Sequence, residues 1–250
     1  MTRNRWIIVI VAAIVVLGGL IALSSRTGLD VSKIDTNKII PANTKAGGVT
    51  VAIGDHVYGN TSGKVLMVEY GDLQCPSCGS LHPQLSPLLA YYKDSLTFAF
   101  RNFPLTSIHP NALAAATAVE AAGLQGKYWE MNNLLYNDQT SWSSDSTSQR
   151  TDAFKSYAGN LGIDTNKFVT DLSSNDVATK IKFDTALGQK LGVNATPTVY
   201  LQGKNIVDAT GKAVQGDATD LETAIRSALS AAGMIYPSQT YAESQKAAGN

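Results

Sequence analysis

The chain has 250 residues, of which 44% are apolar, and its 20 basic and 20 acidic side chains leave no formal net charge. This size fits one domain with an elaboration or two small domains, and the apolar content is sufficient for a buried core. The sequence offers no basic surface, no P-loop and no glycine-rich dinucleotide motif after a strand, so we expect neither nucleic-acid binding nor nucleotide phosphate chemistry.

An uncharged run from Trp6 to Leu23 follows Arg3 and Arg5 near the N-terminus. Its length is at the short end of what spans a bilayer as one helix, and it exceeds the usual apolar region of a cleaved signal peptide. We therefore predict a single-pass membrane anchor over residues 1–24, with a cleaved signal as the alternative. The positive charges on the two sides of this run do not settle its orientation.

The next segment, residues 25–48, is polar and is interrupted by Pro41 and two glycines, which is typical of a linker. Val49 to Ile53 alternates weakly between apolar and polar residues and is a candidate first strand. Val65 to Tyr70 is almost continuously apolar, which predicts a strand that is buried on both faces.

The only two cysteines of the chain follow that strand in a Cys-Pro-Ser-Cys motif at residues 75–78. Pro76 stands where proline is tolerated, in the first turn of a helix that the pattern extends to about Lys93. Pro83 and Pro87 should kink or interrupt this helix.

Leu96 to Arg101 predicts another strand, and the pattern from about Pro110 to Leu191 is helical. Helices are expected in this block at residues 111–122, 127–137, 149–160, 165–172 and 175–191. A strand at 198–201, a tight turn, a returning strand at 206–208 and an amphipathic helix at 217–232 follow. This order predicts an α/β domain of thioredoxin type over residues 49–233, with a helical insertion at about 106–191 and a flexible tail at 234–250.

A dithiol or disulfide at a strand-to-helix junction indicates a redox centre. A Cys75–Cys78 disulfide would close so small a loop that it could constrain the unfolded chain only weakly. The N-terminus of a helix favours negative charge, so the Cys75 thiolate should be stabilised and its pKa lowered below about 8.5. Pro76 and Ser77 bring no positive charge, so this shift should come mainly from the helix end. Cys78, one turn later, should be more buried and should resolve the mixed disulfide.

A zinc site is the structural alternative, because Cys75, Cys78 and His82 could supply three ligands. His56 and His109 are the other histidines of the chain, and no second pair of cysteines exists. The redox interpretation is therefore favoured. The position of His82 allows it to face either the site or solvent, and His109 is expected to order the loop before the first inserted helix.

Thr196-Pro197 stands immediately before a predicted strand. A proline here cannot donate a backbone hydrogen bond to a neighbouring strand, so its presence calls for an explanation. If this peptide bond is cis, the loop can pack beside the cysteines, and Thr196 can offer backbone groups to an incoming extended peptide. An ordinary trans proline at a strand edge is the alternative.

Glu69 is an acid within an apolar strand, and desolvation should raise its pKa if it is buried. Its position before Cys75 would allow it to lie under the disulfide and to exchange a proton with Cys78. A solvated position at the strand end is the alternative. Tyr128, Trp129 and Trp142 have the spacing of an aromatic core within the insertion.

These residues resemble the DsbA-like thiol–disulfide oxidoreductases of the thioredoxin superfamily, in particular the membrane-anchored bacterial kind. The resemblance covers about Val65 to Ala232 and rests on four segments. They are Glu69 to Cys78, Phe100 to Leu105 with His109-Pro110, Gln125 to Met131, and Val193 to Thr198.

The resemblance implies a thioredoxin fold with an inserted helical domain and a cis-proline at Pro197. It implies Cys75 as nucleophile, Cys78 as resolving cysteine and Glu69 as buried acid, with Thr196, Pro197, Pro76 and Ser77 at the substrate-binding surface. No cofactor other than the Cys75–Cys78 disulfide is expected.

The implied function is oxidation of thiols in exported proteins by a catalytic domain outside the cytoplasm, tethered to the bacterial cell membrane. A membrane quinone reductase, DsbB-like or resembling vitamin K epoxide reductase, is the implied electron partner. The strongest oxidases of the family carry Pro-His between the cysteines where this chain has Pro-Ser. A disulfide reductase or isomerase therefore stays an alternative, as does a non-catalytic peptide-binding module.

Overall fold

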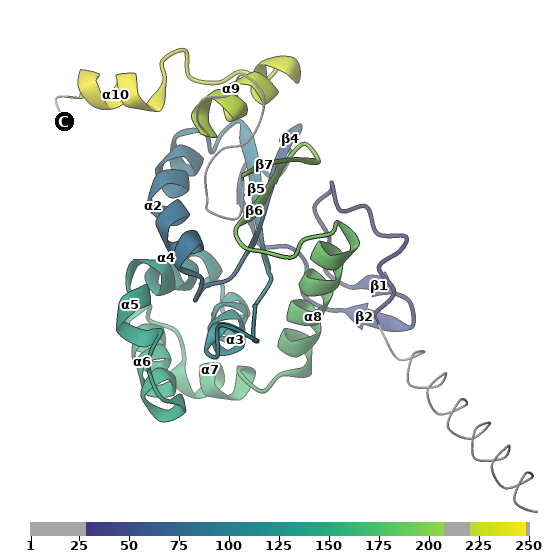
Figure 1. Cartoon of the computed structure of the whole chain (residues 1–250), viewed down its shortest axis with the longest axis vertical. Helices are drawn as coiled ribbons and strands as arrows, with labels where there is room; N and C mark the ends of the chain where they lie inside the picture. Colours follow the sequence, from purple (N-terminus) through teal and green to yellow (C-terminus); the bar gives the residue numbers. More distant parts are fainter. Residues whose placement is uncertain (1–28, 208–220, 249–250) are drawn as a thin grey trace, which may run out of the picture.

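A five-stranded mixed sheet forms the centre of the computed structural model, which describes residues 29–207 and 221–248 (Figure 1). Its order is β3-β5-β4-β6-β7, with β4 and β5 parallel and the other neighbouring pairs antiparallel. The strands are β3 (Val57–Gly59), β4 (Val65–Gly71), β5 (Leu96–Asn102), β6 (Thr198–Leu201) and β7 (Lys204–Val207). The predicted strands at 65–70, 96–101 and 198–201 thus form the middle of the sheet.

The helices between β5 and β6 make up the expected helical block. They are α3 (Ala112–Gly123), α4 (Tyr128–Asn137), α5 (Gln139–Trp142), α6 (Thr147–Asn160), α7 (Thr165–Asp171) and α8 (Asn175–Lys190). The other described helices are α2 (Pro76–Tyr91), α9 (Leu221–Ala231) and α10 (Tyr241–Ala247). The helix α2 is continuous through Pro83 and Pro87, so the predicted interruption is wrong.

The two faces of the sheet are covered by different helices. Alternate residues of a strand point to opposite faces, so Met67 of β4 joins a buried cluster that also contains Leu85 of α2 and Ile225 of α9. Tyr70 points the other way and packs in a cluster with Phe183 of α8. The last helix of the predicted insertion is therefore also a layer of the sheet domain, and α3 to α7 extend beyond it (Figure 1).

The prediction that residues 25–48 are a linker is wrong for the described part, from residue 29 onward. Ile40 and Ala46 are buried in the same cluster as Tyr70. The strand β1 (Thr44–Ala46) pairs with β2 (Val49–Val51) in a separate two-stranded sheet. Arg101 also donates from Nη1 to the Thr36 carbonyl and from Nη2 to the Lys38 carbonyl, each at 2.9 Å.

The prediction of a flexible tail at 234–250 is wrong for residues 234–248. Arg226 of α9 donates to the carbonyl oxygens of Pro237, Ser238 and Gln239. The helix α10 begins next, and its Tyr241 ring packs against Tyr91 of α2. The Arg226 guanidinium therefore holds this segment in place, although its polar composition had suggested that it was unstructured.

Within residues 29–207 and 221–248, no helix is long and apolar enough to cross a membrane. The predicted anchor, Trp6 to Leu23, lies outside the described residues.

Candidate active site

The two cysteines lie at the start of α2, directly after the loop that leaves β4. Cys75 is the residue before the first helical position and Pro76 is the first residue of the helix. Both cysteines are free thiols in the structure. Cys75 exposes 6% of its surface and Cys78 exposes 1%. Both cysteines are thus buried, and Cys78, one turn later, is the less exposed of the two, as the sequence predicted.

The surroundings of Cys75 favour its thiolate and lower the pKa of Cys75 to about 5. The largest cause is a hydrogen bond from the Cys78 thiol, and burial opposes it. The Thr196 side chain and the backbone N–H groups of Cys78 and Ser77 contribute further. The sequence analysis assigned this shift mainly to the helix end, whereas the resolving thiol makes the largest contribution.

Cys78 and Glu69 are shifted in the opposite direction. Burial raises the pKa of Cys78 well above its ordinary value. Its hydrogen bond to Cys75 and the charge of Glu69 raise this pKa further. Burial also raises the pKa of Glu69 to about 8, and the Cys75 charge adds to this effect. At neutral pH, Cys75 is therefore a thiolate, whereas Cys78 and Glu69 hold their protons. Titratable groups whose surroundings push their pKa values apart are typical of acid–base sites.

The loop before β6 completes the site. The Thr196-Pro197 peptide bond is cis, and Sγ of Cys75 lies 3.3 Å from the Thr196 carbonyl oxygen. Thr196 is buried, Ser77 is half-buried and Pro76 is exposed. The structure thus brings all seven predicted site residues into one region, with Pro76 and Ser77 on its outer side.

A family comparison matches residues 51–218 of the chain to thioredoxin. The chain belongs to the thioredoxin family.

Several solved structures share the fold of this chain. It superposes on BdbD from Bacillus subtilis with a TM-score of 0.60 and 21% identity, covering 77% of this chain and 99% of that one. The thiol-disulfide exchange protein alpha-DsbA2 from Wolbachia pipientis gives 0.57 and 20%, over 71% and 87% of the two chains. Wolbachia pipientis alpha-DsbA1 gives 0.51 and 25%, over 65% and 79%. The predicted α/β thioredoxin fold with a helical insertion is therefore confirmed.

Curated sequence relatives include large transporters. The chain is 36% identical over 154 residues to the Na(+)/H(+) antiporter NhaA 1 of Mycolicibacterium gilvum. It is 36% identical over 150 residues to a protein of the same name from Salinispora arenicola. Both matches cover 60% of this chain, but they cover 24% and 22% of the antiporters. Since the thioredoxin chain spans about a quarter of the length of these relatives, their name gives no argument for ion transport here.

The inserted helices hold the active-site loop through a network that the sequence did not reveal. Asp72 accepts a hydrogen bond from the Leu105 backbone N–H at 2.9 Å, and its Oδ2 lies 2.7 Å from Nδ1 of His109. His109 thus orders the loop before α3, as expected. The Gln74 side chain bonds to two backbone groups. Its Oε1 accepts from the Asn111 N–H, and its Nε2 donates to the Ser143 carbonyl.

Gln139 of α5 contacts the active-site loop most directly. Its Nε2 donates to the Leu73 carbonyl at 2.7 Å and to the Cys75 carbonyl at 3.0 Å. Its amide also fills the space beside Gly79, where any Cβ would collide with it. The insertion therefore fixes the backbone that carries the nucleophile. No pattern marked Gln139, since its role depends on how α5 packs.

His82 lies on the inner side of α2, where its ring stacks on Tyr136 of α4 with 4.8 Å between the ring centroids. In the part of the chain that the structure describes, no group of three or more His, Cys, Asp and Glu side chains is arranged to hold a metal ion. Cys75, Cys78 and His82 thus do not form the three-ligand set that a zinc site would need. Tyr128 and Trp142 are buried in the core, while Trp129 is partly exposed.

A Glu69→Gln variant should be more stable than the wild-type protein, by an amount that grows with pH. Burial raises the pKa of Glu69 to about 8, whereas the ordinary value is 4.5. The native state therefore loses stability relative to the unfolded state as the pH rises from about 4.5 to about 8. Glutamine does not ionise, so we expect a gain on the order of 4 kcal/mol at pH 8 and almost none at pH 4. Urea denaturation of the reduced protein measures this difference, and a gain independent of pH would contradict a buried ionisable Glu69.

Proposed function

We propose that this protein is a thiol–disulfide oxidoreductase that acts outside the cytoplasm and oxidises thiols of exported proteins through a Cys75–Cys78 disulfide. The opposite pKa shifts of the two cysteines carry this proposal. A low pKa stabilises the reduced enzyme and makes Cys75 a good leaving group. Both properties favour accepting electrons from a client.

The proposed reaction starts from the oxidised enzyme. A client thiolate attacks the Cys75 sulfur, so a bond between the client and Cys75 forms and the Cys75–Cys78 bond breaks. The electron pair of that bond stays on Cys78. Glu69, which is protonated at neutral pH, gives its proton to the Cys78 thiolate, whose pKa is high.

The second step releases the oxidised client. Another client thiolate attacks the client sulfur of the mixed disulfide, and Cys75 leaves as a thiolate. The client has lost two electrons and the enzyme disulfide has gained them. Thr196 and cis-Pro197, beside Cys75, would hold the client backbone in an extended conformation, with Pro76 and Ser77 on the outer side.

The enzyme must then be reoxidised by an electron acceptor. For a domain tethered to the bacterial cell membrane by residues 1–24, a membrane quinone reductase, DsbB-like or resembling vitamin K epoxide reductase, is the proposed acceptor. A paired thiol that cycles through a disulfide suits an oxidising compartment outside the cytoplasm. No cofactor beyond the cysteine pair is required by this cycle.

The equilibrium reduction potential tests the proposal. Cys75, with a pKa of about 5, lies between thioredoxin at about 7 and DsbA at about 3.5. Those two proteins have potentials of about −270 and −120 mV. We therefore expect a value between about −220 and −120 mV at pH 7, measured on the full chain in glutathione buffers by thiol alkylation.

Other results of the same titration assign the protein differently. A potential near −270 mV would make it a reductase, because a dithiol more reducing than its clients cannot oxidise them. A pair that does not exchange with glutathione at all would favour the peptide-binding alternative.

A further inference from the structure

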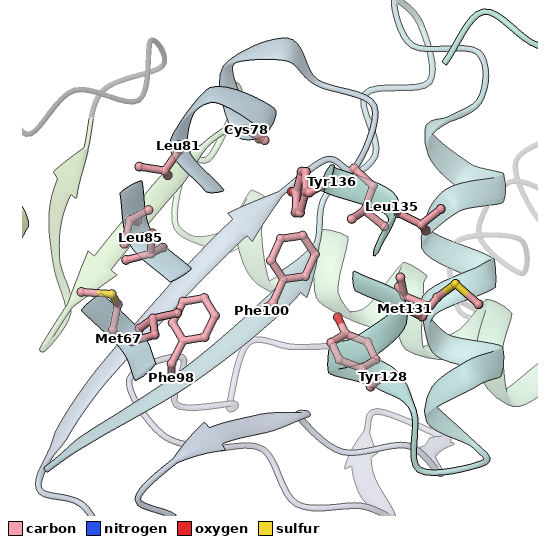
Figure 2. Close-up of a cluster of buried hydrophobic side chains, with 14 of the residues drawn as sticks. Met67, Cys78, Leu81, Leu85, Phe98, Phe100, Tyr128, Met131, Leu135 and Tyr136 are labelled. Atoms are coloured by element: carbon pink, nitrogen blue, oxygen red, sulfur yellow. The ribbon is translucent and has the colours of Figure 1, made fainter. Parts of the chain in front are cut away.

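A cavity of about 50 Å³ lies between α2, α4 and the sheet. Positions 82, 85, 86 and 89 of α2 form one wall, and four residues of α4 with the same helical spacing form the opposite wall. Glu69 of β4 and Phe100 of β5 lie on its floor. In Figure 2, α2, the two strands and α4 enclose this region, with Tyr136 above Phe100. The cavity therefore connects Glu69 with the space between the two helices.

Four polar side chains in this cavity have no hydrogen-bond partner within the described residues. The Asn132 amide nitrogen and the Tyr136 hydroxyl are buried and unpaired. Glu69 and His82 also line the cavity, and neither makes a hydrogen bond to residues 29–207 or 221–248. Buried polar groups are nearly always satisfied by protein or by water. At about 50 Å³, the cavity has room for about three water molecules.

The exposure of these side chains falls along the cavity. His82 is partly exposed, whereas Asn132, Tyr136 and Glu69 are buried. The cavity thus joins partly exposed side chains, His82 among them, to a buried carboxyl under the active site.

From this geometry we propose that the cavity holds a chain of water molecules through which His82 exchanges protons between solvent and Glu69. The inference rests on the proposed thiol–disulfide function, in which Glu69 serves Cys78. His82 does not touch the sulfurs and acts on them only through Glu69. Asn132 and Tyr136 orient the water chain.

The proton balance of the cycle requires such a path. When Cys78 leaves as a thiolate, Glu69 gives it a proton and is left as a buried carboxylate. Solvent then returns a proton to Glu69 by way of His82 and the water chain. In the reverse direction Glu69 takes the Cys78 proton and releases it outward, so that Cys78 can attack a mixed disulfide on Cys75.

The charges around His82 suit a relay. The titratable groups that line the cavity are Tyr58 of β3, Glu69 of β4, His82 of α2 and Tyr136 of α4. Burial lowers the pKa of His82 and raises that of Tyr136 well above its ordinary value. At neutral pH the imidazole is therefore uncharged and can take up a proton and pass it on, whereas Tyr136 stays a hydroxyl.

The test follows oxidation of the reduced full chain by oxidised glutathione in a stopped-flow fluorimeter. At saturating glutathione the rate is limited by attack of Cys78 on the Cys75–glutathione disulfide, which requires removal of the Cys78 proton. We expect His82→Ala to lower this limiting rate about tenfold at pH 7. This is less than the roughly hundredfold or more that a direct acid–base group contributes, because His82 acts only through Glu69 and the water chain. Added imidazole should restore the rate, because it can enter the space of the missing ring.

Asn132→Leu separates a relay from a structural role. Removal of an unpaired buried amide should leave the melting temperature unchanged or raise it. The limiting rate should nevertheless fall several-fold, since the water chain loses a partner. Gln84→Ala, at an exposed position of the same helix, is the matched control and should behave like the wild-type protein.

Wild-type limiting rates from pH 5 to 9 in a folded His82→Ala or Asn132→Leu protein would overturn the relay alone. If His82→Ala does not fold, His82→Gln keeps a polar side chain that cannot carry a proton, and the same slow rate is expected. Absence of any exchange in the wild-type protein would instead overturn the proposed function, and the relay with it.

Discussion

Replacement of Cys75 by serine is expected to reduce thiol oxidation to the rate measured without protein. The serine hydroxyl stays protonated at neutral pH, whereas the pKa of the Cys75 thiol is about 5. No intramolecular disulfide can form in the variant, since Cys75 and Cys78 are the only cysteines of the chain. Oxidation of a dithiol peptide, followed by thiol alkylation and mass spectrometry, measures the effect.

The companion variant Cys78→Ser should keep the nucleophile, Cys75, and lose the thiol that resolves the mixed disulfide. Its Cys75 thiolate attacks an oxidised client or glutathione disulfide, so a client–Cys75 bond forms and a client thiolate leaves. Without the Cys78 thiol the adduct should accumulate as a covalent species that dithiothreitol removes. Full oxidase activity in Cys75→Ser, or a resolved adduct in Cys78→Ser, would be incompatible with the proposed mechanism.

The central elements and the site could be predicted from the sequence because each depends on a local pattern. A buried strand followed by a Cys-Pro-Ser-Cys motif places Cys75 at a helix N-terminus whatever the rest of the chain does. Glu69 interrupts an apolar run, and Thr196-Pro197 precedes a strand. Such signals lie within a few neighbouring residues and survive without knowledge of the packing.

The parts that could not be predicted depend on contacts between distant segments. The segment before β2 looked like a linker because what holds it is the guanidinium of Arg101, which binds the carbonyl oxygens of Thr36 and Lys38. Any residue can supply a backbone carbonyl, so no side-chain pattern marks such a segment. The cavity is similar, since the residues that line it come from five different elements. The available signal was Asn132, a polar residue next to Met131 and Tyr136 on a buried helix face.

Substitution of Lys180 by methionine is expected to destabilise the protein by about 3–5 kcal/mol. Lys180 is fully buried, and its Nζ lies 2.6 Å from Oδ1 of Asp184 and 3.3 Å from Oδ1 of Asp55. Asp55 also pairs with Arg101, at 2.8 Å. Methionine keeps the length of the side chain but leaves carboxylates in the core without one of their two cations. Loss of one partner from a buried ion pair is costly for this reason.

The matched control is two residues away on the same helix. Lys182 is exposed, and Lys182→Met makes the same chemical change without uncovering a buried charge. We expect it to lie within about 0.5 kcal/mol of the wild-type protein. For a chain of this size, the Lys180→Met cost corresponds to a fall in melting temperature of about 6–20 °C. Equal melting temperatures for the two variants would show that the cluster contributes no net stability.

The pH dependence identifies the cause of that cost. Burial alone would lower the pKa of Lys180, but the carboxylates of Asp184 and Asp55 raise it above its ordinary value, so Lys180 is charged throughout the range from pH 5 to 9. Burial raises the pKa of Asp184, and the charge of Lys180 opposes this.

Removal of Lys180 should raise the pKa of Asp184 further. A group whose pKa is raised in the native state lowers stability as the pH rises through that range. The gap between Lys180→Met and the wild-type protein should therefore be largest at pH 7 to 8 and smaller at pH 5, where protonation of Asp184 removes the uncompensated charge. A gap that does not change with pH would instead assign the loss to packing around the methionine.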